Sequence, residues 1–354
     1  MTLDPIFHKD IIDSIEEMKE LMPNFKDKTF FVTGATGLVG YQFIMTLVYM
    51  NEYFKTNCKI IGHARNKEKF DALYEEYQNQ GILGVFQDIT EPIHFDGTVD
   101  YVLHTAATTQ SKLIINNPAK TFYDMIDGTR AVLEFTKEKG AKVIFTSSME
   151  AYGRYDEFTE VTEKDLGYLD VTNPRNVYPE GKRASEMIAF AYGKEASLDV
   201  IVARLAQTFG SGVSTLENRF FAQLAKNVIN GQDIVLKTDG ESVANYCDIR
   251  DVVQAFMYLF VKGERNNIYN ISNPKSTMRI KEVASLVAER ITGNQIQVVY
   301  EIEDLQKSGF AEKTQIKLNV DKIVKLGWKP QRSLEASFHS LIDSFKEREE
   351  GIQA

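Results

Sequence analysis

The sequence predicts an α/β protein built on a doubly wound parallel sheet. Two observations support this fold class. Short apolar runs alternate with segments of helical spacing from residue 28 to residue 205, and the first apolar run leads through a glycine-rich turn into a helix. Such alternation is typical of parallel sheets that carry helices on both faces.

The first part of the chain supplies the strands of this sheet. A helix over 5–22 precedes them, because apolar residues recur there at helical spacing. Strands are predicted at 28–33, 58–62, 85–89, 101–105, 142–147 and 200–205. Helices are predicted between them at 37–51, 67–80, 119–139 and 178–195. The series is that of a Rossmann sheet.

Beyond residue 209 the alternation weakens. Helices are predicted at 219–230, 251–262, 280–292 and 334–348, with one short strand at 234–237. We therefore expect three regions. They are an N-terminal helical extension over 1–27, a Rossmann domain over 28–206 with about 242–262, and a smaller C-terminal α/β substrate-binding cap made of 207–241 and 263–354.

The composition excludes several classes of function. The net charge is −9 and the pI is near 5.3, which argues against a nucleic acid or an anionic membrane surface as partner. Cys58 and Cys247 are too few and too distant for a disulfide scaffold, and the five histidines show no metal-binding spacing. No apolar run reaches the ~18 residues of a membrane span, and the N-terminus lacks the apolar core of a signal peptide. We expect a cytoplasmic protein without a metal.

The turn after the first strand predicts a dinucleotide site. Gly34 lets the chain turn, Gly37 lets the backbone approach a pyrophosphate, and Gly40 allows close packing of the helix, whose N-terminus attracts phosphates. A chance glycine-rich turn is the alternative, but the strand–turn–helix context favours the site. The predicted contacts are Gly34, Thr36, Gly37, Leu38, Val39 and Gly40.

The ends of the next two strands bear on the choice between NAD+ and NADP+. The second strand usually ends in an acid that binds the ribose, whereas here Arg65 follows with no acid before it, which favours a 2′-phosphate and so NADP+. A solvated loop arginine is the alternative. Asp88, next to Ile89, is predicted to accept a bond from the adenine amino group, or else simply to start a loop.

Three residues form a candidate proton-transfer set. Tyr178 and Lys182 lie four residues apart and so share one face of a helix. A lysine ammonium favours the phenolate, so we expect it to lower the pKa of the tyrosine toward neutrality. Ser148 follows a buried strand, where ligands bind in parallel sheets. Without Tyr178 and Lys182, the default interpretation of Ser148 is a helix cap or a turn residue.

Several ordered motifs make the chain resemble the extended short-chain dehydrogenase/reductases that modify nucleotide sugars. They run from TGATGLVG at 33–40 through VDYVLHTAA at 99–107, SSMEAYG at 147–153, YPEGKRASE at 178–186 and RLAQTFG at 204–210 to YNISNP at 269–274. The resemblance covers about 28–345. It adds Ile89, Ala106 and Ala107 to the expected cofactor contacts. It is nearest to UDP-glucuronate decarboxylases and nucleotide-sugar 4,6-dehydratases.

The resemblance implies roles for four residues. Tyr178 takes the proton of the sugar 4-OH, Lys182 supports it and Ser148 orients the same oxygen, while the cofactor takes the C4 hydride. The 4-ketone then acidifies the neighbouring C–H, and Glu150 occupies the position of the glutamate that acts on C5. Capping of the next turn is the alternative for Glu150. Such chemistry suits the biosynthesis of surface-polysaccharide sugars.

Four departures from the family pattern affect the substrate side. Met149 replaces an acid, Ala244 an arginine that grips the diphosphate, Gln207 an asparagine, and Met125 the asparagine that supports a relay water. A thioether cannot protonate a leaving hydroxyl, and losing a bidentate guanidinium is not conservative. The expected substrate-binding residues are Ser148, Met149, Gln207, Arg219, Lys237 and Arg250, the last three being equally plausible as surface residues.

Three functions remain open from the sequence. The first is an NAD(P)-dependent sugar-nucleotide epimerase or dehydratase. The second is a simple C4 dehydrogenase or reductase on a sugar nucleotide or polyol, with decarboxylase-like activity as a further variant. The third is a non-catalytic binding protein of the same fold. We also expect a homodimer, because helix 119–139 has more apolar residues than one sheet face needs and the family pairs it with the Tyr178 helix. These residues are Phe122, Tyr123, Met125, Ile126, Ala131, Val132 and Phe135.

Overall fold

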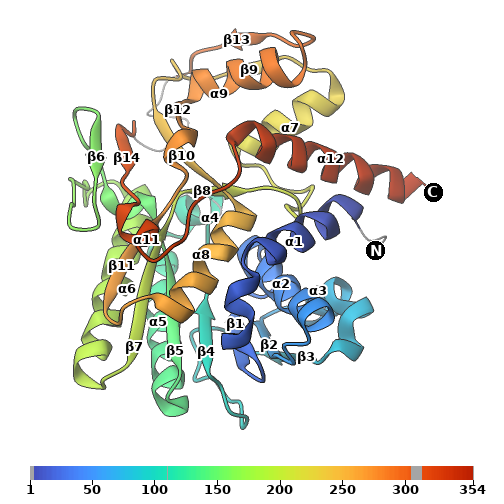
Figure 1. Cartoon of the computed structure of the whole chain (residues 1–354). Helices are drawn as coiled ribbons and strands as arrows, with labels where there is room; N and C mark the ends of the chain where they lie inside the picture. The colour runs from blue at the N-terminus through green and yellow to red at the C-terminus, as the bar shows by residue number, and fades with distance from the viewer. Residues whose placement is uncertain (1–3, 110, 304–312, 354) are drawn as a thin grey trace.

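The computed structural model describes residues 4–109, 111–303 and 313–353. Its centre is a seven-stranded sheet of order β11-β7-β5-β4-β1-β2-β3 (Figure 1). All neighbouring strands are parallel, which confirms the predicted doubly wound sheet. The strands are β1 Thr29–Thr33, β2 Lys59–Ala64, β3 Ile82–Phe86, β4 Tyr101–His104, β5 Lys142–Ser148, β7 Asp199–Leu205 and β11 Asn267–Ile271.

Helices cover both faces of this sheet. Side chains alternate between the faces of a strand, and β1 shows the consequence. Phe30 belongs to the core shared with α2 (Leu38–Phe54) and α8 (Ile249–Lys262). Its neighbour Phe31 belongs to the core shared with α5 (Pro118–Lys139) and α6 (Val177–Glu195). The remaining helices of this part are α3 Lys67–Tyr74, η2 Glu75–Gln80, α4 Ser111–Asn116, η3 Met149–Tyr152 and η4 Pro174–Asn176.

A smaller cap packs on the large sheet. It has a three-stranded sheet of order β12-β10-β8 and two pairs, β13 with β9 and β14 with β6. Figure 1 shows α7, α9 and α12 gathered above the large sheet, and they share a second core. The elements of the cap and of the segments that join it to the large sheet are β6 Thr159–Val161, β8 Gln207–Phe209, α7 Phe220–Asn230, β9 Ile234–Leu236, β10 Val243–Asp248, η5 Pro274–Ser276, β12 Thr277–Arg279, α9 Ile280–Leu286, η6 Val287–Ile291, β13 Val298–Tyr300, β14 Ile316–Leu318, α11 Asp321–Val324 and α12 Leu334–Gln353. Of these, α11 contacts β11 of the large sheet. Within the described ranges, no helix combines the length and apolar character needed to span a membrane.

Several elements differ from the prediction. The helix expected over 67–80 changes to 3-10 geometry after Tyr74, and that over 280–292 changes to a π-helical turn at Val287. The helix expected over 5–22 ends at Glu17 and continues as η1 (Lys19–Phe25), which contains Pro23. Proline removes an N–H and disfavours α geometry at the residue before it. The strand β11 was not predicted, and it completes the large sheet from within the range expected for the cap.

The N-terminal helix α1 (Pro5–Glu17) is tied to the rest of the fold by a buried ionic cluster. Asp10 of α1 lies 2.5 Å from Nη1 of Arg250 in α8. The same carboxylate accepts hydrogen bonds from the hydroxyls of Ser211 and Ser340, at 2.6 and 2.5 Å. The expected extension is therefore packed between α8 and α12, although its residues 1–3 lie outside the described ranges.

We predict that Asp10→Ala lowers the free energy of unfolding by about 3–5 kcal/mol, because it leaves the buried Arg250 charge with one partner fewer. The measurement is urea denaturation followed by circular dichroism. Glu16→Ala on the same helix is the control, since Glu16 pairs with Lys19 at 3.5 Å in solvent and should contribute about 0–1 kcal/mol. Equal stability losses in both variants would contradict the role of the cluster.

Candidate active site

The turn after β1 requires glycine at two positions. Gly34 has φ +69°, and a Cβ there would lie 2.9 Å from the backbone nitrogen of Ala106. A Cβ on Gly40 would lie 2.3 Å from the carbonyl oxygen of Gly34. Both distances exclude a side chain, so the turn, the start of α2 and the loop after β4 pack at backbone contact.

This contact lies where the strand order of the sheet reverses, between β1 and β4. Ligands of doubly wound sheets bind beyond the strand ends at such a point. The N-cap of α2 is Gly37, and no side chain caps the first N–H groups of this 17-residue helix. Free N–H groups at a helix start attract phosphate. The cradle and the helix start thus fit a dinucleotide pyrophosphate, and the predicted contacts lie in these two adjacent segments: Gly34, Thr36, Gly37, Leu38, Val39, Gly40, Ala106 and Ala107.

The predicted adenosine-side residues lie at the ends of β2 and β3. Arg65 Nη1 is 4.0 Å from Oδ2 of Asp88, and both side chains are partly exposed. Asp88 accepts hydrogen bonds from the N–H and hydroxyl of Thr90, at 3.0 and 2.8 Å. The Thr90 bonds and the Arg65 charge together lower the pKa of Asp88, while its partial burial opposes the shift. Ile89 packs toward Gly128 of α5, where a Cβ would meet it at 3.1 Å.

The structure brings Ser148, Tyr178 and Lys182 together. Ser148 ends β5, and its hydroxyl accepts a hydrogen bond from the N–H of Glu150 at 3.2 Å. Hydrogen bonding by this hydroxyl also lowers the pKa of Tyr178, at the start of α6. One helical turn later, Lys182 donates from Nζ to the carbonyl oxygen of Thr146 at 2.8 Å. This ammonium lies 5.9 Å from the centroid of the Tyr178 ring. Both side chains are buried, so their charged forms are sensitive to every nearby group.

The electrostatics differ from the expected effect of Lys182 on the phenol. The pKa of Tyr178 is raised, first by burial and then by the negative charge of Glu150. The Ser148 hydrogen bond and the charges of Arg175 and Arg219 act in the opposite direction. Burial lowers the pKa of Lys182 to about 8. Among the groups of the chain itself, desolvation therefore outweighs the charges that favour the phenolate.

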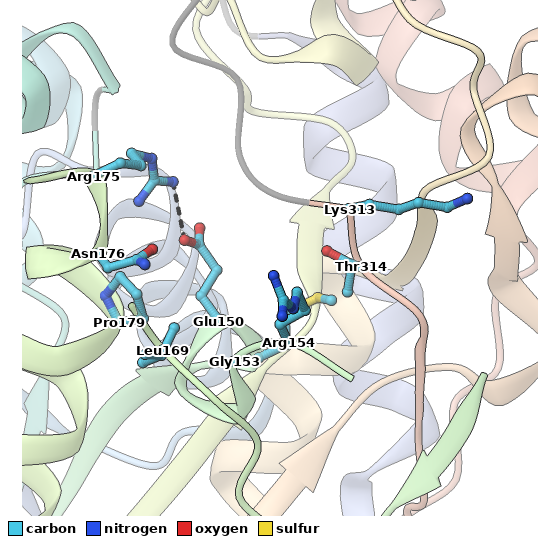
Figure 2. A pocket seen from close by; sticks show the side chains of 10 residues that line it. Glu150, Gly153, Arg154, Leu169, Arg175, Asn176, Pro179, Lys313 and Thr314 are labelled. Atoms are coloured by element: carbon cyan, nitrogen blue, oxygen red, sulfur yellow. Dashed lines mark hydrogen bonds and ion pairs between the residues drawn. The ribbon is translucent and has the colours of Figure 1, made fainter. Parts of the chain in front are cut away.

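Glu150 and Arg175 form an ion pair in a pocket beside this set. Nη2 of Arg175 lies 2.9 Å from Oε2 of Glu150, and Figure 2 shows the two side chains pointing toward each other. Lys313 extends away from the pair in the same view. Sequence reasoning missed Arg175, although an arginine three positions before the tyrosine is a usable signal. The described residues that line the pocket are Met149, Glu150, Gly153, Arg154, Leu169, Arg175, Asn176, Pro179, Lys313 and Thr314.

The other predicted substrate-binding residues are distributed differently. Arg219 pairs with Glu217 at 2.7 Å, yet its charge reaches Tyr178. Gln207 is exposed on β8. Lys237 pairs with Glu303 at 2.6 Å on the exposed end of β9 in the cap.

The structure does not bring Arg250, which was expected to bind substrate, to the pocket that Glu150 and Arg175 line. The guanidinium of Arg250 is buried and bonded to Asp10 and Asp248, with Nε 2.7 Å from Oδ1 of Asp248. These two carboxylates hold the Arg250 guanidinium at the junction between α1 and α8. A sequence motif cannot show this, because Asp10 is distant from Arg250 along the chain.

Met125 and Ala244, two of the departures from the family pattern, lie in apolar cores. Met125 forms a small core with Ile114 and Tyr178, and its thioether would lie 3.0 Å from a Cβ on Gly181. Ala244 is buried in β10 within the core of the cap. In the described part of the chain, no group of three or more His, Cys, Asp or Glu side chains is placed to hold a metal ion.

Comparisons with known proteins agree with this geometry. Residues 30–272 match the model of the NAD dependent epimerase/dehydratase family. UDP-glucuronic acid decarboxylase 6 of Arabidopsis thaliana is 26% identical over 322 residues, which cover 90% of this chain and 88% of that protein.

Two solved structures show the same fold. One is UDP-glucose 4-epimerase of Thermotoga maritima with UDP-glucose, at a TM-score of 0.74 and 22% identity, covering 90% of this chain and 99% of that one. The other is dTDP-glucose 4,6-dehydratase of Bacillus anthracis in complex with NAD, at a TM-score of 0.72 and 21% identity, covering 91% and 98%.

Proposed function

The chain belongs to the NAD dependent epimerase/dehydratase family, and we propose that it oxidises a nucleotide sugar at C4 and then epimerises or dehydrates the 4-keto sugar. The observation that carries this proposal is the placement of Ser148, Tyr178 and Lys182 at the carboxyl end of β5, with Glu150 on the adjoining turn. A hydroxyl, a phenol and an ammonium in this order suit removal of an alcohol proton.

The first step needs Tyr178 as phenolate. Tyr178 then takes the 4-OH proton, while the Ser148 hydroxyl holds the same oxygen. When bound, NAD(P)+ supplies the hydride acceptor and a positive charge. Such a charge near the phenol favours the phenolate and so offsets the burial that raises the pKa of Tyr178.

The second step falls to Glu150. A 4-ketone acidifies the C5 proton, and a carboxylate at the edge of the site can remove and return it. The Glu150 side chain is 34% exposed, so it can meet a sugar that enters the pocket. Met149 supplies no proton, so dehydration requires water or another residue as acid. Epimerisation at C4 requires none, because the hydride returns to the other face of the 4-ketone.

Decarboxylation is a second candidate, favoured by Glu150 and by the similarity to UDP-glucuronic acid decarboxylase 6. The buried Ala244 counts against it, since the family carries an arginine there. A single redox step at C4 is the remaining enzymatic alternative. Mass spectrometry of products from a panel of nucleotide sugars separates these outcomes.

We predict that Tyr178→Phe lowers turnover by a factor of ~10² or more, because the general base is removed. Cofactor binding, measured by calorimetry, should remain. Near-normal turnover by Tyr178→Phe would refute the base.

We predict that Glu150→Gln keeps cofactor reduction but loses the incorporation of solvent deuterium at C5 when the reaction runs in D₂O. A wild-type product without solvent deuterium on the sugar would refute the role of Glu150 at C5.

We further propose that Arg65 gives a preference for NADP+ over NAD+. Its exposed guanidinium stands at the end of β2, where a 2′-phosphate would be a better acceptor than Asp88 at 4.0 Å. Calorimetry on cofactor-free protein should show tighter binding of NADP+, with the difference narrowed in Arg65→Ala and kept in Lys67→Ala, a nearby exposed control. Tighter binding of NAD+ by the parent protein would refute the preference.

We also propose a cytoplasmic homodimer that pairs α5 and α6 with their copies. On the inner face of α5, Val132 and Phe135 are buried in the core against the sheet. The outer faces still expose Tyr123 on α5 and Met187 on α6, at 66% and 74%. Light scattering at micromolar concentration should give twice the 40.2 kDa chain mass. A monomer mass would contradict the dimer, and Tyr123→Glu with Met187→Glu should produce one.

A further inference from the structure

The backbone of Arg175 is held by a capped turn, independently of the contacts that its side chain makes in the site. It lies in η4, the short turn directly before α6. Its backbone N–H donates to Oδ1 of Asn173 at 3.0 Å, which caps the turn. Its side chain is only 13% exposed. A guanidinium held on a capped turn at the start of the Tyr178 helix has little freedom to leave the site.

This guanidinium contacts both proposed reactive groups. It forms the 2.9 Å bond to Glu150, and its centre lies 5.8 Å from the centroid of the Tyr178 ring. Glu150 comes from the turn after β5, whereas Tyr178 comes from α6. Arg175 therefore bridges the two elements that carry the chemistry. Surface ion pairs contribute little, but a mostly buried arginine that reaches two reactive groups has a larger electrostatic effect.

We propose that Arg175 is a positioning residue, which aims the Glu150 carboxylate at the sugar and offsets the effect of its negative charge on Tyr178. This inference rests on the proposed function and deepens it. No position in the motifs discussed above assigns a role to Arg175.

The charges around Tyr178 explain why such a residue is needed. Glu150 disfavours the phenolate, while Arg175, Arg219 and the Ser148 hydrogen bond favour it. The Nζ atom of Lys182, on the next turn of α6, lies 5.9 Å from the centroid of the Tyr178 ring. If Arg175 is removed, the Glu150 charge acts on the phenol without its closest opposing partner. The base would then ionise only at higher pH.

One nitrogen of Arg175 is still without an acceptor. Nη1 is buried and has no hydrogen-bond partner among the described residues. A buried donor in this state is destabilising by about 1–3 kcal/mol, and such groups call for an explanation. A group kept for function accounts for it better than one kept for stability, because a purely structural arginine would gain from a second acceptor.

The test compares Arg175→Gln and Arg175→Lys with the wild-type holoenzyme. Cofactor reduction with the active nucleotide sugar is followed against pH, and solvent deuterium at C5 is measured by mass spectrometry. In Arg175→Gln, the acidic limb of the kcat/KM profile should move up by about one pH unit, and C5 deuterium should fall several-fold. Arg175→Lys should have a smaller effect than Arg175→Gln on the pH profile and on the deuterium at C5. Arg290→Gln removes an exposed arginine of the cap and controls for net charge.

A second readout does not depend on turnover. Ring-¹³C-labelled tyrosine in the NAD+-bound protein reports ionisation of Tyr178 by NMR, with the signal assigned by Tyr178→Phe. Arg175→Gln should delay ionisation to higher pH, and Glu150→Gln should advance it. An unchanged pH profile, unchanged deuterium and an unchanged Tyr178 titration would each overturn the inference. If the protein processes no nucleotide sugar at all, the proposed function fails, while the Tyr178 titration still decides the role of Arg175.

Discussion

The close approach of two backbone segments at the centre of the sheet determines where everything else in the site lies. Gly34 meets the loop after β4, and Gly40 meets Gly34, at distances that no side chain permits. This contact seats the start of α2 against the point where the strand order reverses. Because the strands are parallel, the end of β5 opens on the same edge two strands from β1. The proposed cofactor cradle and the hydroxyls of Ser148 and Tyr178 are thereby fixed relative to each other by the sheet.

Charge balance is the second constraint on the site. Tyr178 and Lys182 are both buried, and burial disfavours the charged form of each. In the proposed reaction the phenolate therefore needs compensating positive charge, and Arg175 and Arg219 supply part of it. In the proposed function, Glu150 disfavours the phenolate of the first step but acts as the base of the second. The proposed role of the Arg175–Glu150 pair reconciles these two demands, since the guanidinium opposes the carboxylate charge beside the phenol.

The sequence predicted the features that follow from local pattern. The parallel sheet, the glycine turn and the Ser148, Tyr178 and Lys182 positions all rest on short motifs with a fixed structural context. Contacts between residues far apart along the chain could not be predicted from the sequence. Arg250 was expected at the substrate, but its partner Asp10 lies 240 positions away, on a helix that precedes the family match. The strand β11 has five residues, and the strands of the cap have three to six, too few for a clear period. The sign of the Tyr178 shift depends on burial, which no motif encodes.

The central claim is that the reaction passes through hydride transfer from C4 of the sugar, and isotope transfer tests it most directly. UDP-glucose and UDP-glucuronate carrying deuterium at C4 would be incubated with the protein and NAD+ or NADP+ in a single turnover. Mass spectrometry of the quenched cofactor would follow. The account predicts deuterium on the reduced nicotinamide, with none transferred by Tyr178→Phe. Product formation with all the deuterium still at C4 and none ever found on the cofactor would contradict it.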